Sequence, residues 1–141
     1  MPTLEDAIAL ALEAHRGQVD KGGQPYILHP LRVMLRMESE VEKVVGILHD
    51  VVEDTWYTQE DLRSRGYPTE VLEPLDCLIK RPGEEYEDFI KRIEPNPLAR
   101  RVKLMDIEDN MDVRRLSTMT ENDLQRLERY RKAWAELKRG S

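Results

Sequence analysis

The chain has 141 residues, of which 35% are charged and 6% are aromatic, and its formal net charge at pH 7 is −6. A chain of this length can bury a core of its own, and we expect residues 1–141 to form one domain. The charged, aliphatic composition is typical of a soluble helical protein. Because a negative net charge opposes the neutralisation of many phosphates, the composition argues against duplex nucleic acid as a partner, whereas a small nucleotide is compatible with it.

Helix signals follow one another along the chain with little strand signal between them, so we predict an all-α, single-domain bundle of about eight helices. Candidate caps at Thr3 and Thr58, and a proline suited to a first turn at Pro30, set several of the boundaries. Pro74 must lie near a first turn or kink its helix. Residues 17–28 are expected to be a loop. The predicted helices span residues 4–16, 30–37, 41–55, 58–66, 69–80, 84–93, 96–111 and 120–138.

The sequence shows no targeting or membrane-spanning segment. Residues 1–6 lack a basic stretch followed by an apolar one, and no apolar run approaches the length of a membrane span. We therefore expect a cytoplasmic protein with no membrane partner. The single cysteine, Cys77, lies in an apolar stretch, which predicts a small buried core residue rather than a nucleophile or a metal ligand.

The predicted helix at 41–55 carries a group of polar side chains on the face opposite its apolar positions. His49 lies one turn before Glu53 on that face. Asp50 has the same relation to Asp54. Taken alone, the pattern fits a solvated face as well as a binding site.

Two distant segments add the same residue types. His29 stands at a loop-to-helix junction, directly before Pro30. Asp106 and Asn110 lie one turn apart in a largely apolar stretch, which is typical of polar groups that face a cleft. Imidazole nitrogens and carboxylate oxygens together suit a divalent transition metal. We interpret the three segments as one site, and we expect His15, on the first helix, to support the structure rather than to bind metal.

The order of these residues resembles a known family. His29, then His49 with Asp50, then Asp106 is similar to the signature of the HD-domain metal-dependent phosphohydrolases. More narrowly, residues 7–116 resemble the hydrolase domain of the RelA/SpoT-type stringent-response enzymes. The segments that carry this resemblance are AHRGQ at 14–18, PYILHP at 25–30, LHDVVEDT at 48–55 and VKLMD at 102–106.

The resemblance implies an all-helical HD-type fold and a metal-dependent hydrolase. It implies one Mn²⁺ per chain, with removal of pyrophosphate from the 3′ position of guanosine 3′,5′-bis(diphosphate), ppGpp, to give GDP. The larger enzymes of the family carry a separate synthetase domain, so at this length we expect a stand-alone hydrolase. The oligomeric state is not defined by the sequence. The implied metal ligands are His29, His49, Asp50 and Asp106.

The resemblance also implies roles for residues around the metal. Glu53 and Asp54 correspond to catalytic residues, which would orient water and manage protons. Asn110 corresponds to a nucleotide contact, and Lys21 to a lysine that neutralises substrate phosphate. The chain departs from the family at Asp20, which replaces a basic neighbour of that lysine in a shortened loop.

Two alternatives stay open on the sequence. The same metal site can serve another nucleotide phosphoester, such as a nucleoside monophosphate or NADPH, and Asp20 is the residue that favours this reading. A helical metal-binding module without turnover is the second alternative. The intact pair of Glu53 and Asp54 argues against it.

Overall fold

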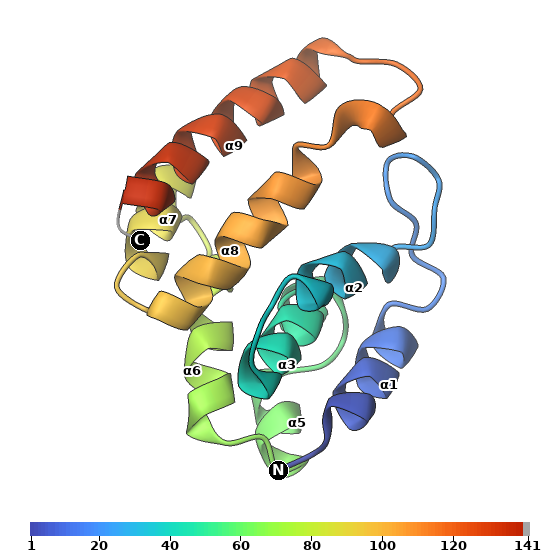
Figure 1. The fold of residues 1–141 in the computed structure, drawn as a ribbon, viewed down its shortest axis with the longest axis vertical. Helices are drawn as coiled ribbons and strands as arrows, with labels where there is room; N and C mark the ends of the chain where they lie inside the picture. The colour runs from blue at the N-terminus through green and yellow to red at the C-terminus, as the bar shows by residue number, and fades with distance from the viewer. Residues whose placement is uncertain (140–141) are drawn as a thin grey trace.

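The computed structural model describes residues 1–139, and the described part of the chain is all-helical (Figure 1). Between Val19 and Pro25 there is one isolated antiparallel bridge, and no strand lies within the described residues. With α3 and α4 counted as the single helix expected there, the α-helices match the predicted bundle of about eight. The elements are α1 (Leu4–Ala14), α2 (Leu28–Leu35), α3 (Glu40–Leu48), α4 (Val51–Asp54), α5 (Gln59–Ser64), α6 (Thr69–Cys77), α7 (Tyr86–Ile93), α8 (Pro97–Asn110), the 3₁₀ helix η1 (Val113–Arg115) and α9 (Glu121–Arg139).

Capping side chains determine where several helices begin. Thr3, Ser39 and Thr58 each form a capping box with the acidic residue three positions later. Asn96 caps α8, with Pro97 as the first helical residue. Such caps pair backbone N–H groups that have no partner within the helix, and they depend only on neighbouring residues. The predicted caps at Thr3 and Thr58 are therefore confirmed, as is the predicted helix start at Asn96 and Pro97.

The helix α2 begins at Leu28, two residues earlier than the predicted start at Pro30. Pro30 is tolerated in the first turn because the N–H it lacks would have no helical partner there. His29 therefore belongs to the helix rather than to the preceding loop. Its side chain is buried between α2 and α8.

The prediction of one continuous helix at 41–55 is wrong in its middle, because the helix is interrupted between α3 and α4. His49 ends α3, and Asp50 leads into α4 with φ −103° and ψ −2°. Both residues keep backbone angles close to helical ones, so sequence periodicity gives no sign of the break. His49 is 4% exposed and does not lie on a solvated face.

The helix α6 differs from its prediction at its C-terminal end. It stops at Cys77 rather than near Lys80, and Pro74 lies inside it, past the first turn. The sequence predicted that Cys77 is buried within the core, but Cys77 is half-buried at the edge of the core. Burial still raises the pKa of the Cys77 thiol, which opposes a role as a nucleophile.

The helix α3 occupies the centre of the fold and contacts α1, α2, α6 and α8 (Figure 1). The helix α9 lies along α8 and also contacts α7. In the described part of the chain, no helix has the length and apolar character needed to cross a membrane. The buried residues of α3 include Val44, Val45, Ile47 and Leu48, each fully buried.

We expect Gly46→Val to lower the free energy of unfolding by about 1–3 kcal/mol, the usual cost of overpacking. A Cβ at Gly46 would approach the Cα of Met34 to 3.2 Å, where α2 crosses α3. Urea unfolding followed by circular dichroism measures the change. Ala9→Val, on the exposed face of α1, is the control, with an expected cost of about 0.7 kcal/mol or less. Equal losses in the two variants would contradict close packing at Gly46.

Candidate metal centre

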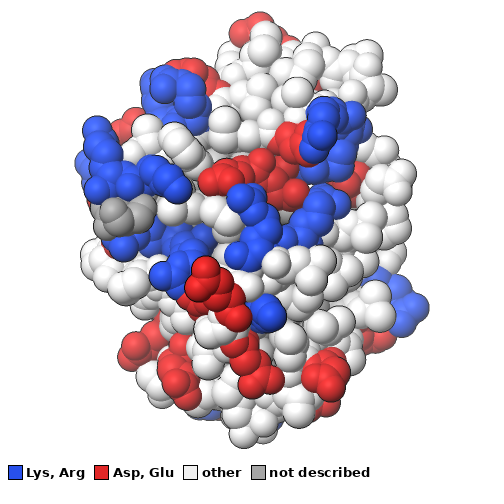
Figure 2. All heavy atoms as spheres, in the orientation of Figure 1, with Lys and Arg blue, Asp and Glu red and all other residues white. Residues whose placement is uncertain are grey.

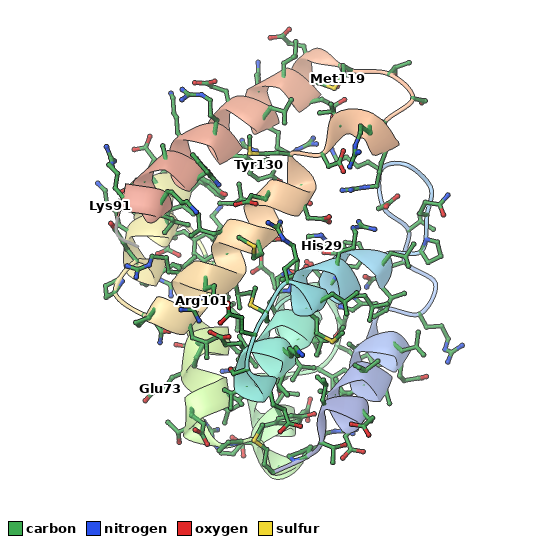
Figure 3. The ribbon with its side chains drawn as sticks, in the orientation of Figure 1. His29, Glu73, Lys91, Arg101, Met119 and Tyr130 are labelled. Atoms are coloured by element: carbon green, nitrogen blue, oxygen red, sulfur yellow. The ribbon has the colours of Figure 1, made fainter. Side chains whose placement is uncertain are left out.

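Four side chains that the sequence places far apart meet in one cluster. His29, His49, Asp50 and Asp106 each offer one ligand atom, and these atoms all lie within 4.8 Å of one another. The Nε2 atom of His29 lies 2.8 Å from Oδ1 of Asp106. The Nε2 atom of His49 lies 3.3 Å from the same oxygen and 3.1 Å from Oδ2 of Asp50. The structure thus brings together all four residues predicted as metal ligands. Figure 3 shows His29 near the middle of the molecule.

The second nitrogen of each imidazole is occupied outside the cluster. Nδ1 of His49 lies 2.6 Å from the carbonyl oxygen of Gly46, which can only accept. That nitrogen therefore carries a proton, and in the neutral imidazole the lone pair of Nε2 faces the cluster. Nδ1 of His29 lies 2.6 Å from Oδ2 of Asp109 in the same way. Histidines that bind metals characteristically donate their outer N–H to a carbonyl or a carboxylate, so the donor set fits a divalent transition metal.

Asp109 is a residue of this site that the sequence analysis missed. Its carboxylate receives hydrogen bonds from Nε and Nη2 of Arg32 at 2.7 and 3.0 Å, besides the one from His29. Burial would raise the pKa of Asp109, but these donors hold it below its usual range. The position three residues after Asp106, on the same face of α8, is the sequence signal that could have identified it.

Lys103 is the second residue that was missed. Its Nζ lies 2.9 Å from Oδ2 of Asp106, and the rings of Tyr86 and Phe89 lie beside it. Burial would lower the pKa of Lys103, but the charge of Asp106 raises it on balance, so the ammonium stays protonated. Lys103 thus binds Oδ2 of Asp106, while Oδ1 faces the two imidazoles. A lysine three residues before Asp106, in an otherwise apolar stretch, was the available signal.

Glu53 and Asp54 are exposed on α4, and Asp54 lies close enough to the cluster to interact with the charges of Asp50 and His49. Partial desolvation, together with the negative charges of Asp50 and Glu53, raises the pKa of Asp54 to about 6. The backbone N–H of Lys80 donates to Oε2 of Glu53 at 3.3 Å. A carboxyl group that titrates near neutral pH is suited to exchanging protons with water or substrate.

The other two predicted site residues line a pocket of about 270 Å³ next to the cluster. Asn110 connects the pocket to the cluster, because its Nδ2 donates to Oδ1 of Asp106 at 3.1 Å. Tyr26 connects them as well, through a hydrogen bond from its hydroxyl to Asp50. The lining includes Lys21, Tyr26, Asn110, Arg115, Arg126 and Tyr130.

Asp20 has a local role that the sequence did not reveal. Its Oδ1 accepts hydrogen bonds from the backbone N–H groups of Gly22 and Gln24, both at 2.9 Å. Such bonds are typical of an aspartate that fixes a tight loop. A Cβ at Gly22 would come within 2.5 Å of the carbonyl oxygen of Arg115, so the loop packs closely on the chain after α8. Asp20 thus holds Lys21 in place at the edge of the pocket.

Comparison with known proteins adds to this geometry. No family model matches the chain. It is 34% identical over 112 residues to a Haemophilus influenzae protein and 31% identical over 118 residues to an Aquifex aeolicus protein, both named guanosine-3′,5′-bis(diphosphate) 3′-pyrophosphohydrolase. These matches cover 71% and 77% of this chain. The resemblance to RelA/SpoT-type enzymes is confirmed.

The relatives of RelA/SpoT type are much longer than this chain, which spans only 16% and 17% of those two proteins. A Myxococcus xanthus protein named GTP pyrophosphokinase is 35% identical over 82 residues, covering 55% of this chain and 11% of that protein. A solved structure of a metazoan ortholog of SpoT, described as hydrolysing ppGpp, has a TM-score of 0.78 at 22% identity. The match covers 99% of this chain and 88% of that one, so the two share a fold.

We expect the purified protein to bind about one divalent transition metal per chain and His49→Ala to bind almost none, because the variant removes one of two nitrogen donors. Inductively coupled plasma mass spectrometry after dialysis measures the content. Glu53→Gln is the control, since Glu53 lies outside the ligand cluster, and it should retain the metal. Equal metal content in the parent and in His49→Ala would remove His49 from the ligands.

Proposed function

We propose that this chain is a Mn²⁺-dependent hydrolase that removes pyrophosphate from the 3′ position of ppGpp to leave GDP. The observation that carries the proposal is the convergence of two imidazole Nε2 atoms and two carboxylates beside the acidic pair of α4. The names of the relatives and the shared fold support the choice of substrate. We also propose that residues 1–141 form one hydrolase domain and act in the cytoplasm.

The chemistry divides between the metal and the protein. A divalent metal held by the four ligands would polarise a phosphoryl oxygen and lower the pKa of water bound to it. Glu53 and Asp54 orient the attacking water and take up its proton, for which Asp54, with a pKa of about 6, is suited near neutral pH. Lys103 balances the charge of Asp106 throughout. Mn²⁺ fits a donor set of two nitrogens and two carboxylates.

The pocket beside the cluster supplies the substrate contacts in this proposal. Lys21 and Arg126 reach its edge, where both are near one carboxylate, Asp123, at 3.8 and 3.2 Å. Phosphate groups of the substrate would compete with that carboxylate for the two cations. Asn110 offers a donor and an acceptor to the ribose or to a base edge. Figure 2 shows acidic side chains flanked by basic ones near the middle of the face that it displays.

A second substrate class has support from the same pocket. The carboxylates of Asp20 and Asp112 lie among its lining residues, and negative charge disfavours a ligand with many phosphates. The second candidate is therefore a nucleotide with fewer phosphates near the loop, such as NADPH or a nucleoside monophosphate.

A substrate panel tests the proposal directly. Parent protein loaded with Mn²⁺ is incubated with ppGpp, GMP and NADPH, and the release of pyrophosphate and of phosphate is measured separately. Pyrophosphate and GDP from ppGpp, abolished by a chelator and restored by Mn²⁺, are the expected result. Phosphate release from NADPH or GMP alone would favour the second candidate. No turnover of any of the three would contradict the proposed activity.

We expect Glu53→Gln and Asp54→Asn each to lower kcat by about 10²- to 10⁴-fold, the usual contribution of a group that transfers protons. The metal content should be unchanged, because neither residue belongs to the ligand cluster. Steady-state kinetics with metal analysis on the same preparations checks both points. Parental rates in both variants would show that the acidic pair is only a polar helix end.

We expect Lys21→Gln to raise KM for ppGpp by about two- to fivefold, as for an exposed charge contact, and to change KM for a monophosphate less. The difference should shrink as salt rises, because exposed charges are screened beyond about 10 Å at 0.1 M ionic strength. Lys91→Gln is the matched control, since Lys91 on α7 lies far from His29 (Figure 3). Asp20→Arg is a poorer test of charge, because it also removes two hydrogen bonds of the loop. An unchanged KM in Lys21→Gln would exclude Lys21 from phosphate binding.

A further inference from the structure

The helix α4 carries the acidic pair, yet it contains only four residues. Its own backbone bonds are those from Asp54 N–H to the carbonyl of Asp50 and from Thr55 N–H to the carbonyl of Val51, at 2.9 and 3.1 Å. Helices of one turn are unstable by themselves, because nucleation fixes several residues for one or two bonds. Val51 anchors the start of α4 in the core. The end of α4, where Asp54 lies, needs another support.

That support comes from a segment more than thirty residues earlier. Nε2 of Gln18 donates to the carbonyl oxygen of Asp54 at 3.0 Å, across 36 positions of sequence. This carbonyl is among the last of α4 and has no partner within a helix that ends there. The side chain of Gln18 thus supplies a hydrogen-bond donor to the backbone carbonyl of Asp54, the residue to which the proposed function assigns proton transfer.

His15 fixes the orientation of the Gln18 amide. Nδ1 of His15 lies 2.9 Å from Oε1 of Gln18. Because the Asp54 carbonyl can only accept, the amide nitrogen must face Asp54 and the amide oxygen must face His15. Nδ1 of His15 therefore carries a proton. His15 is 1% exposed, and burial lowers the pKa of its imidazole, which keeps it neutral.

The same segment also contacts the other end of the acidic stretch. The ring of Tyr26 lies 5.0 Å from that of His15, and its hydroxyl donates to Asp50. The N-terminal segment therefore holds Asp50 through Tyr26 and Asp54 through Gln18. Among the described contacts of Gln18, none involves His29, His49 or Asp106. Loss of the Gln18 amide is thus separable from loss of metal.

We infer that Gln18 is a positioning residue that fixes Asp54 for proton transfer by holding the end of α4, and that His15 orients Gln18 for this contact. The kinetic half of this inference rests on the proposed function, in which Asp54 acts on water. The structural half, that the Gln18 amide restrains α4, stands on the hydrogen bonds alone.

The test uses Gln18→Glu, which keeps the size of the side chain and an acceptor for His15 but replaces the amide donor with a carboxylate oxygen. We expect kcat to fall about 10- to 100-fold, the range that a small misplacement of a catalytic group can cause. KM and metal content should not change. Gln24→Glu is the matched control, because Gln24 is exposed in the same loop and only its backbone forms hydrogen bonds among the described contacts. It should behave as the parent does.

A double-mutant cycle shows whether Gln18 acts through Asp54. In the Asp54→Asn background, Gln18→Glu should lower the residual kcat by less than about twofold, because the group it positions is already gone. A full 10-fold or greater loss in that background would overturn the inference. So would a parental kcat in Gln18→Glu alone.

Amide hydrogen exchange measures the structural half without any substrate. Gln18→Glu should accelerate exchange in residues 51–55 but not in α3 or α8, and Gln24→Glu should accelerate neither. Unchanged exchange in residues 51–55 would overturn the restraint whatever the activity of the protein. If parent protein hydrolyses nothing while exchange changes as expected, the proposed function fails and the restraint stands. Gln18→Met, of similar length and without a donor, replaces Gln18→Glu if circular dichroism shows that the glutamate variant is unfolded.

Discussion

The placement of a buried carboxylate, Asp106, beside a second, half-buried one, Asp50, is the constraint on which this structure depends. Asp50 and Asp106 both approach the imidazole of His49, in a place with little access to water. Burial opposes ionisation of Asp106, but Lys103 and the two imidazoles hold its pKa well below the usual range. Like charges at such distances repel strongly in a medium of low dielectric, so the fold must supply compensating donors. A divalent cation among the four ligand atoms is the natural further compensation.

The compensation is arranged in layers around that cluster. Lys103 binds the far oxygen of Asp106, and Asp109 binds the far nitrogen of His29. Arg32 in turn neutralises Asp109 through two hydrogen bonds. His29, His49 and Asp106 are therefore each oriented by a partner on the side away from the centre. This arrangement fixes lone pairs and protons before any ligand arrives, which lowers the cost of binding.

The predicted ligand His49 is held by the core, whereas the acidic pair Glu53 and Asp54 lies on a short helix with fewer supporting contacts. The central helix α3 ends at the cluster, so His49 is held by the core of the protein. Glu53 and Asp54 follow on a single turn of helix, whose later part depends on the loop around Lys80 and on Gln18. In the proposed function, metal binding and proton transfer therefore depend on different parts of the chain. This separation explains why variants of α4 and of Gln18 are expected to change rate without changing metal content.

The sequence by itself predicted the helical class, the caps at Thr3 and Thr58 and the four side chains that the structure gathers in one cluster. Caps such as Thr3 and Thr58 can be predicted from sequence because they pair with backbone groups only three positions away. His29, His49, Asp50 and Asp106 were predicted as metal ligands from residue type and order, and the structure brings these four side chains together. That they bind metal remains a prediction. The assignment of Glu53, Asp54, Lys21 and Asn110 to catalysis and substrate remains a prediction.

Only the tertiary structure decided the break after His49, the burial of that imidazole and the partners of the site. The contact between His29 and Asp109 spans 80 positions, and that between Gln18 and Asp54 spans 36. Hydrogen bonds of this kind exist only when packing brings two distant segments to a few ångströms, and no local periodicity encodes them. The same reason explains the edge position of Cys77, since an apolar neighbourhood in sequence does not specify which side of a helix faces the core.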